Sequence, residues 1–434
     1  MPMRLPVLLL SVITACGDTG KLAADSSSGR GAPVTDDGRT CQSEVMVPTG
    51  TLPGDPVPAA SHTEAYGADP DPFHVHLGLP TRDPSTSISM IWRTDADTLA
   101  SVVEFGPAEA WPAQTTRVEG YTFGFGGGEL GTGPYRVHEV RLCDRLEPGK
   151  AYTYRVGGDG GWSAPFTFTT PGTPGSFDTF RVAMAGDSRG AYDTWAQVVT
   201  AMESHEPDLF LFSGDMVELG ALQSEWDAWF TASGDAFARK PIIPAHGNHE
   251  FLAQNYFAQF GAPGNEEWFA IEYADMLVLA LNDTVRDTEE VDTLQSGFVA
   301  AELAATSSRW QVALHHQPLY SRSSTHGSSE ALQAAWGPVY DAGGMDLVVN
   351  GHNHTYERSV PIKGGAEVSP EEGTRYIVTG GAGAPLYTGV DEAWFGVVAE
   401  PVNHYVIADF VAGKATFTVR DLSGNVIDEW TMQR

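Results

Sequence analysis

Two hydrophobic patterns divide the chain near residue 171. From about Phe73 to Pro171, short segments alternate apolar and polar positions, as in Ser87–Trp92 and Ala151–Val156. Turn residues separate these segments and no helical period lies between them, which is typical of an all-β sandwich. We therefore predict an all-β domain over this part of the chain.

After the turn cluster Pro171–Gly175, apolar strands alternate with amphipathic segments of helix length, such as Tyr192–Glu203 and Gln223–Thr231. This alternation is typical of an α/β domain, in which ligands bind beyond the carboxyl ends of the strands. The predicted strands are Phe180–Ala185, Leu209–Phe212, Ile242–Pro244, Met276–Leu281, Val312–Leu314 and Asp346–Val349.

Polar clusters follow all of these strands except Met276–Leu281. They contain carboxylate, amide and imidazole side chains, and because the fold brings the strand ends together, we expect them to form one site. Such donors suit first-row metal ions, and two ions about 3.5–4 Å apart are a common device for displacement at phosphorus. The clusters are Gly186–Arg189, Gly214–Glu218, His246–Glu250, His315–Pro318 and Gly351–His354.

The polar clusters resemble those of a known family. Gly351–Arg358 resembles the closing motif of the purple acid phosphatases, a branch of the calcineurin-like metallophosphoesterases, and Gly247–Glu250 and His316–Tyr320 are similar to its middle motifs. The resemblance spans roughly residues 72 to 434. It implies a fibronectin type III-like (immunoglobulin-like) sandwich followed by a metallophosphatase-type αββα catalytic domain. It also implies acid phosphatase-like hydrolysis of phosphomonoesters by a hydroxide that bridges two metal ions.

The resemblance implies a set of six metal ligands. The two divalent or trivalent ions would be Fe, Zn or Mn. Carried over residue by residue, the set is Asp187 and His354 for the first metal, Asp215 as the bridge, and Asn248, His316 and His352 for the second metal.

Two further histidines match outer positions of the family. His249 would face the phosphate, and His326, ten residues after His316, would be a second outer histidine. Either would serve as the general acid, because histidine titrates near the working pH of most enzymes.

Two positions depart from the family pattern. Purple enzymes carry a tyrosinate ligand three residues after the bridging aspartate, and Glu218 stands there. We therefore expect no iron–tyrosinate colour. Many relatives outside the purple branch carry a histidine two residues after Asp187, where this chain has Arg189, which has no lone pair for a metal. Glu218 would ligate a metal or orient a ligand. Arg189 would pair with Glu218 or grip a substrate phosphate.

Charge narrows the range of partners. The 434 residues include 56 acidic and 25 basic ones, a formal net charge of −31, so we expect neither nucleic acid nor an anionic lipid surface as a partner. The expected partner is a small phosphoester. Two alternatives stay open: a phosphodiesterase or nucleotidase that uses the same metals, and a surface-binding protein with a vestigial metal site.

The first residues resemble an export signal. Arg4 precedes the apolar stretch Leu5–Ile13, and the following residues up to Cys16 resemble a bacterial lipoprotein cleavage box, although ordinary cleavage near Ala15 is the alternative. We expect an exported protein, secreted or held at the cell envelope, with membrane contact only through lipid on Cys16. The predicted organisation is a signal over residues 1–16, a flexible linker over 17–70, the β-sandwich over 71–172 and the catalytic domain over 176–434.

Several other side chains have simpler interpretations. Cys41 and Cys143 form an even pair if Cys16 is lipidated, so a disulfide between them is possible. His74 and His76 alternate along a strand without a third nearby ligand, and we expect both on the surface of the β-domain. His246 and His315 also lie in the clusters but match no ligand position. We expect each of them to pack in the interior or to support a ligand side chain.

Overall fold

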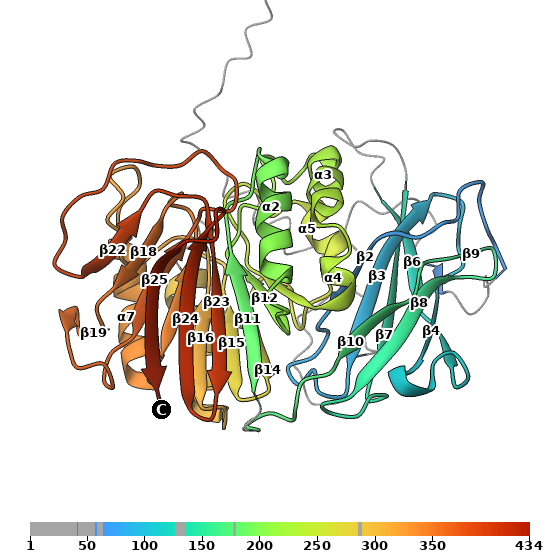
Figure 1. Ribbon diagram of the computed structural model, residues 1–434, viewed down its shortest axis with the longest axis horizontal. Helices are drawn as coiled ribbons and strands as arrows, with labels where there is room; N and C mark the ends of the chain where they lie inside the picture. The colour runs from blue at the N-terminus through green and yellow to red at the C-terminus, as the bar shows by residue number, and fades with distance from the viewer. Residues whose placement is uncertain (1–40, 42–56, 59–63, 126–134, 177–178, 285–288) are drawn as a thin grey trace, which may run out of the picture.

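A computed structural model describes residues 41, 57–58, 64–125, 135–176, 179–284 and 289–434 (Figure 1). The predicted signal over residues 1–16, Cys16 included, and most of the predicted linker lie outside these residues. Within the described residues, no helix has both the length and the apolar character that a membrane crossing requires.

The N-terminal domain is a sandwich of two antiparallel sheets, as predicted. The first sheet has the order β1 (Val57–Pro58), β6 (Tyr121–Phe125), β7 (Tyr135–Leu142), β3 (Ile88–Asp95) and β2 (Phe73–Gly78). The second has the order β10 (Phe166–Thr169), β8 (Ala151–Gly158), β4 (Val102–Pro107) and β5 (Thr116–Glu119), and β9 (Gly161–Trp162) pairs with β8. Buried residues of both sheets, such as Trp92 and Tyr154, meet in one core.

A disulfide joins Cys41 to Cys143, at the end of β7 in the sandwich. This is the pairing that the cysteine count suggested. Together with the pairing of β1 against β6, it fixes described parts of the N-terminal segment to the β-domain.

The C-terminal domain contains two larger sheets. The first has the order β13 (Ile242–Pro244), β12 (Leu209–Phe212), β11 (Phe180–Ala185), β23 (His404–Val411), β24 (Lys414–Asp421) and β25 (Val426–Gln433). The second has the order β14 (Phe269–Tyr273), β15 (Met276–Ala280), β16 (Trp310–Leu314), β17 (Leu347–Asn350), β21 (Arg375–Thr379), β18 (Tyr356–Ser359) and β22 (Gly396–Glu400). A short hairpin of β19 (Ile362–Lys363) and β20 (Ala366–Glu367) follows β18.

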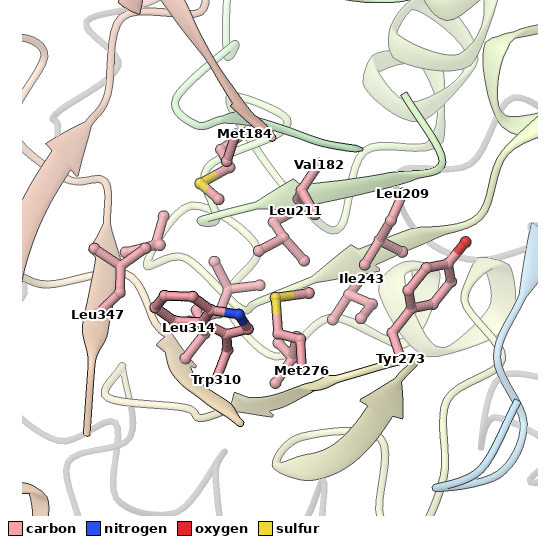
Figure 2. Packing of buried hydrophobic residues seen from close by; sticks show 14 of the residues in the cluster. Val182, Met184, Leu209, Leu211, Ile243, Tyr273, Met276, Trp310, Leu314 and Leu347 are labelled. Atoms are coloured by element: carbon pink, nitrogen blue, oxygen red, sulfur yellow. The ribbon is translucent and has the colours of Figure 1, made fainter. Parts of the chain in front are cut away.

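The two sheets pack face to face around an apolar core, part of which Figure 2 shows. Met184 and Leu211 of the first sheet meet Met276 and Leu314 of the second, and all four are almost fully buried. Helices cover the outer faces, so the layers are αββα, as the resemblance implied. Against the first sheet lie α2 (Tyr192–Glu203), α3 (Gln223–Ser233), α4 (Ala236–Arg239) and α5 (Gln254–Gln259), and against the second lie the π-helix Glu290–Gln295, α6 (Ser296–Ala305) and α7 (Glu330–Gly343).

The β-sandwich docks against α3, α4 and α5, at the right of Figure 1. His76 is 3% exposed, stacks on Phe230 of α3 and hydrogen-bonds the carbonyl of Gln259, while His74 contacts the hydroxyl of Thr231 at 3.1 Å. The prediction that His74 and His76 lie on the surface of the β-domain was therefore wrong. Their alternation placed both on one face of β2, but only the tertiary fold brings α3 against that face.

Candidate metal centre

The polar clusters meet at the carboxyl ends of strands from both sheets. Asp187 and Asp215 follow β11 and β12, and His316 follows β16 in the other sheet. Ligand atoms of these three buried side chains lie within 4.8 Å of one another. The α/β topology thus places donors from distant parts of the sequence in one small volume, which is the arrangement that a metal site requires.

The other three predicted ligands surround this group. Asn248 Oδ1 lies 3.0 Å and His352 Nδ1 lies 3.3 Å from His316 Nε2. His354 Nε2 lies 3.5 Å from Asp187 Oδ1. The structure therefore brings all six predicted side chains together.

Backbone carbonyls fix the orientation of two of the imidazoles. His316 Nδ1 donates to the carbonyl of Ser213 at 2.8 Å, and His354 Nδ1 donates to the carbonyl of Pro385 at 2.7 Å. Each bond leaves the Nε2 atom facing the carboxylates. Metal-binding histidines are usually held in this way, because a bond at one ring nitrogen sets the tautomer and leaves the lone pair of the other for the metal.

The backbone is strained at three of the six residues. Asp187, Asp215 and His352 have φ angles of 60°, 55° and 68°, in the left-handed region that side chains other than glycine rarely adopt. Strain of this kind is retained mainly where function requires a fixed geometry. Gly351 is needed for a steric reason, because a Cβ at this position would lie 2.2 Å from Asp187 Oδ2.

The electrostatics of the cluster fit a cation. Although burial opposes it, the neighbouring Asp215 carboxylate raises the pKa of His316 to about 10, so without a metal this imidazole holds a proton beside the carboxylates. Burial, and then His316, lowers the pKa of His352 to about 2, which keeps its nitrogen lone pair available. Two buried carboxylates, an amide oxygen and three imidazoles match the donor preferences of first-row metal ions. The residues present therefore fit a dinuclear metal centre.

A buried glutamate, whose role the sequence did not reveal, supports the loops. Glu250 is fully buried, and its carboxylate accepts hydrogen bonds from the backbone N–H groups of Asp215 and Met216 at 2.8 Å and Gly247 at 2.6 Å. It thereby joins the loop of Asp215 to the loop of Asn248. The motif Gly247–Glu250 contained the only sequence signal for this role.

The two outer histidines contact different members of the cluster. His249 Nδ1 donates to the carbonyl of Glu218 at 2.7 Å, and its Nε2 points toward Asp215 Oδ2 at 4.0 Å. The ring of His326 lies 4.2 Å from that of His352. Beside His326 and His352, an open pocket of about 230 Å³ is lined by Gln317, Pro318, Gly327, Ser328 and Ser329.

Arg189 and Glu218 form an ion pair at the edge of the centre. Arg189 Nη1 lies 2.7 Å from Glu218 Oε2, and its Nε lies 3.5 Å from Asp215 Oδ2. This is the pairing that one of the two sequence interpretations predicts. The guanidinium thus lies close enough to the Asp215 carboxylate to compete with a metal for this negative charge.

Three other aromatic side chains lie near the centre without belonging to the predicted ligand set. His315 contacts Asp283 at 2.7 Å, and His246 packs against Tyr256 with ring centroids 3.8 Å apart, so both support the loops as expected. Tyr387, which the sequence did not single out, stacks on His354 with ring centroids 4.1 Å apart. It follows β21 in a loop without a polar motif, so no local signal pointed to it.

Comparison with known proteins agrees with this geometry. Residues 180–356 match the family described as calcineurin-like phosphoesterase, and residues 72–170 match the purple acid phosphatase N-terminal domain. The chain is 27% identical over 312 residues to purple acid phosphatase 21 of Arabidopsis thaliana, covering 67% of each chain. It is 23% identical over 332 residues to a nucleotide pyrophosphatase/phosphodiesterase of Hordeum vulgare, covering 63% of this chain and 88% of the relative.

The fold is also similar to that of a solved structure. A purple acid phosphatase from seeds of yellow lupin (Lupinus luteus) superposes with a TM-score of 0.71 at 20% identity, covering 84% of this chain and 74% of that one.

Proposed function

Because residues 180–356 form a calcineurin-like phosphoesterase domain and residues 72–170 a purple acid phosphatase N-terminal domain, we propose that this hydrolase cleaves phosphomonoesters. The observation that supports this proposal most directly is the convergence of six metal donors from five loops. A chain that had lost its chemistry would be expected to have lost some of these donors.

In the proposed centre, Asp187 and His354 would hold one metal and Asn248, His316 and His352 the other, and Asp215 would be shared between the two. Two bound metals would acidify the attacking water and neutralise charge on the phosphoryl oxygens. The protein holds the donors rigidly through Glu250 and the carbonyl bonds to the histidines, so little reorganisation accompanies substrate binding.

His249 and His326 would act on the substrate rather than on the metals. The bond from His249 Nδ1 to the carbonyl of Glu218 directs Nε2 into the site, where it can bind a phosphoryl oxygen or give a proton to the leaving alkoxide. His326 is exposed beside the open pocket, so it would meet the organic part of the ester. The pocket would therefore receive the leaving group.

A second candidate is a phosphodiesterase or nucleotidase with the same catalytic groups. The barley relative, whose name includes phosphodiesterase, supports this candidate, and the shape of the pocket beside His326 would decide between a monoester and a diester. The metal centre would be the same in both enzymes.

One experiment tests the function. The purified protein is analysed for bound metals and assayed with an aryl phosphate and an aryl phosphodiester, beside Asp215→Asn and the surface control Asp193→Asn. We expect monoester hydrolysis that Asp215→Asn abolishes and Asp193→Asn retains. Absence of metal and of hydrolysis under every metal supplement would refute both enzyme hypotheses, and preference for the diester would favour the second.

We also propose that the chain is exported and lipidated on Cys16. The apolar stretch before Cys16 and the Cys41–Cys143 disulfide support export, because such bonds persist in oxidising compartments. Labelled fatty acid should enter the expressed protein and be lost in Cys16→Ser. A parent protein that takes up no label would exclude the anchor.

A further inference from the structure

The loop between β21 and β22 is anchored to both residues proposed for the first metal. The backbone N–H of Ala384 donates to the carbonyl of Asp187 at 2.8 Å, and that of Tyr387 donates to the carbonyl of His354 at 3.1 Å. The carbonyl of Pro385 accepts from His354 Nδ1. Three bonds within four residues therefore hold Tyr387 in a fixed place beside the metal centre.

The same loop is joined to the segment of His326. The backbone N–H of Ser324 donates to the carbonyl of Gly389 at 3.1 Å, and Ser323 forms an antiparallel bridge with Val390. Tyr387 thus lies between a proposed ligand loop and the loop of an outer histidine.

The phenol of Tyr387 points to the groups that would meet the substrate. Its ring stacks on His354 at an interplanar angle of 20°, and its hydroxyl lies 3.4 Å from His326 Nε2. The side chain of Arg189 also lies near this hydroxyl. A hydroxyl between a guanidinium and an imidazole, at the edge of a site for an anion, is well placed to bind a phosphoryl oxygen.

We propose that Tyr387 is a catalytic residue that donates its phenol O–H to a non-bridging oxygen of the phosphoryl group. The inference rests on the proposed function and extends it to a residue outside the ligand motifs. The phenol acts only as a hydrogen-bond donor and keeps its proton throughout. With Arg189 and His326 both near its hydroxyl, the phenol would donate beside two other groups that can face the phosphoryl oxygens.

The main alternative is that Tyr387 binds the first metal as a phenolate. It would then take the place of the tyrosinate that the family carries where this chain has Glu218. The two roles differ in measurable ways: a phenolate ligand would give iron-loaded protein a visible charge-transfer band and would contribute to metal retention, whereas a phenol donor would do neither.

The test compares the metal-loaded parent with Tyr387→Phe, which keeps the stacked ring, and with Tyr405→Phe, which removes a hydroxyl that contacts His205, just after the C-terminal end of α2. Metal content, thermal unfolding, orthophosphate binding by calorimetry and aryl phosphate hydrolysis are measured for each. We expect Tyr387→Phe to fold and retain its metals but to bind orthophosphate about 10- to 100-fold more weakly, with a similar loss in kcat/KM. Tyr405→Phe should match the parent.

Orthophosphate affinity within twofold of the parent in folded, metal-loaded Tyr387→Phe would overturn the inference. Loss of metal, or of a visible band present in the iron-loaded parent, would also overturn it in favour of the phenolate ligand. If the parent hydrolyses no phosphoester while Tyr387→Phe still weakens orthophosphate binding, the role of Tyr387 in anion binding stands and the proposed function fails.

Discussion

The carboxylate of Glu250 accepts a hydrogen bond from the backbone N–H of Asp215 at 2.8 Å, so one buried carboxylate positions another. Burial, and then the charge of Asp215, raises the pKa of Glu250 to about 7. The N–H groups of Met216, Val217 and Gly247 also donate to the Glu250 carboxylate. The strained turn at Asp215 therefore depends on a side chain that would bind no metal.

Glu250→Gln should weaken the metal centre. An amide NH₂ would face backbone N–H groups and leave at least one of them without an acceptor, so the Asp215 loop would shift. We expect metal affinity or activity to fall about 10- to 100-fold, the range typical for partners of metal ligands. Elemental analysis after dialysis measures retention, with Glu429→Gln on the surface as the control for loss of charge. Full retention and activity in Glu250→Gln would exclude this positioning role.

Arg189→Met should affect metal and phosphate in opposite directions. Removing a cation 3.5 Å from Asp215 Oδ2 frees that carboxylate for the metal, so loss of metal to a chelator should slow. The same change removes a donor beside Tyr387, so orthophosphate should bind about tenfold more weakly. The exposed Arg239→Met serves as the control. Metal loss at the parental rate in Arg189→Met would contradict competition for Asp215.

Metal removal should destabilise the catalytic domain. Bound ligand stabilises the folded state by mass action, by about 4 kcal/mol when its free concentration is a thousand times the dissociation constant. Thermal unfolding of chelator-treated protein should therefore begin at lower temperature and recover when metal is restored. Asp215→Asn should respond much less. Equal melting with and without metal would argue against a metal centre built into the fold.

Acid should destabilise the β-sandwich through His138. This buried imidazole stacks on Trp92, and burial, and then Arg136, lowers its pKa from 6.5 to about 3. Between these values the unfolded chain binds more protons than the folded chain, so stability falls as pH drops below 6.5. Each pH unit in this range costs about 1.4 kcal/mol, or about 2 kcal/mol at pH 5.

Denaturant unfolding of the parent and of His138→Gln at pH 7 and pH 5 measures this effect. The variant should be less stable at pH 7 because it loses the stacked ring, but it should lose less stability on acidification. The same pH dependence in both proteins would show that His138 does not account for it.

Reduction should loosen the N-terminal segment. The Cys41–Cys143 bond closes a loop over a sequence separation of 102 residues, and the entropy of such a loop gives a maximum stabilisation of about 4.7 kcal/mol. A reductant should lower the denaturation midpoint of the parent. Cys143→Ser should start at that lower midpoint and be insensitive to the reductant, and a parent insensitive to reduction would contradict this contribution.

The sequence by itself determined the ligand motifs and the strands that precede them. Leu209–Phe212 is apolar throughout and Phe180–Ala185 is apolar except for Arg181, because both faces of each strand are largely buried. Asp187 and Asp215 follow these strands two and three positions later. Since parallel strands of one sheet end at one edge, the convergence of Asp187 and Asp215 followed from topology alone. The local sequence patterns were therefore sufficient to locate the six donors.

Only the tertiary structure decided which other groups join them. Glu250 supports Asp215 through backbone N–H groups, and Tyr387 reaches His354 from a loop with no motif of its own. His76 appeared to lie on an exposed strand face until α3 packed against it. Hydrophobic periodicity records whether a position is buried, but it does not record which distant segment covers it, because that depends on how the sheets and domains pack together.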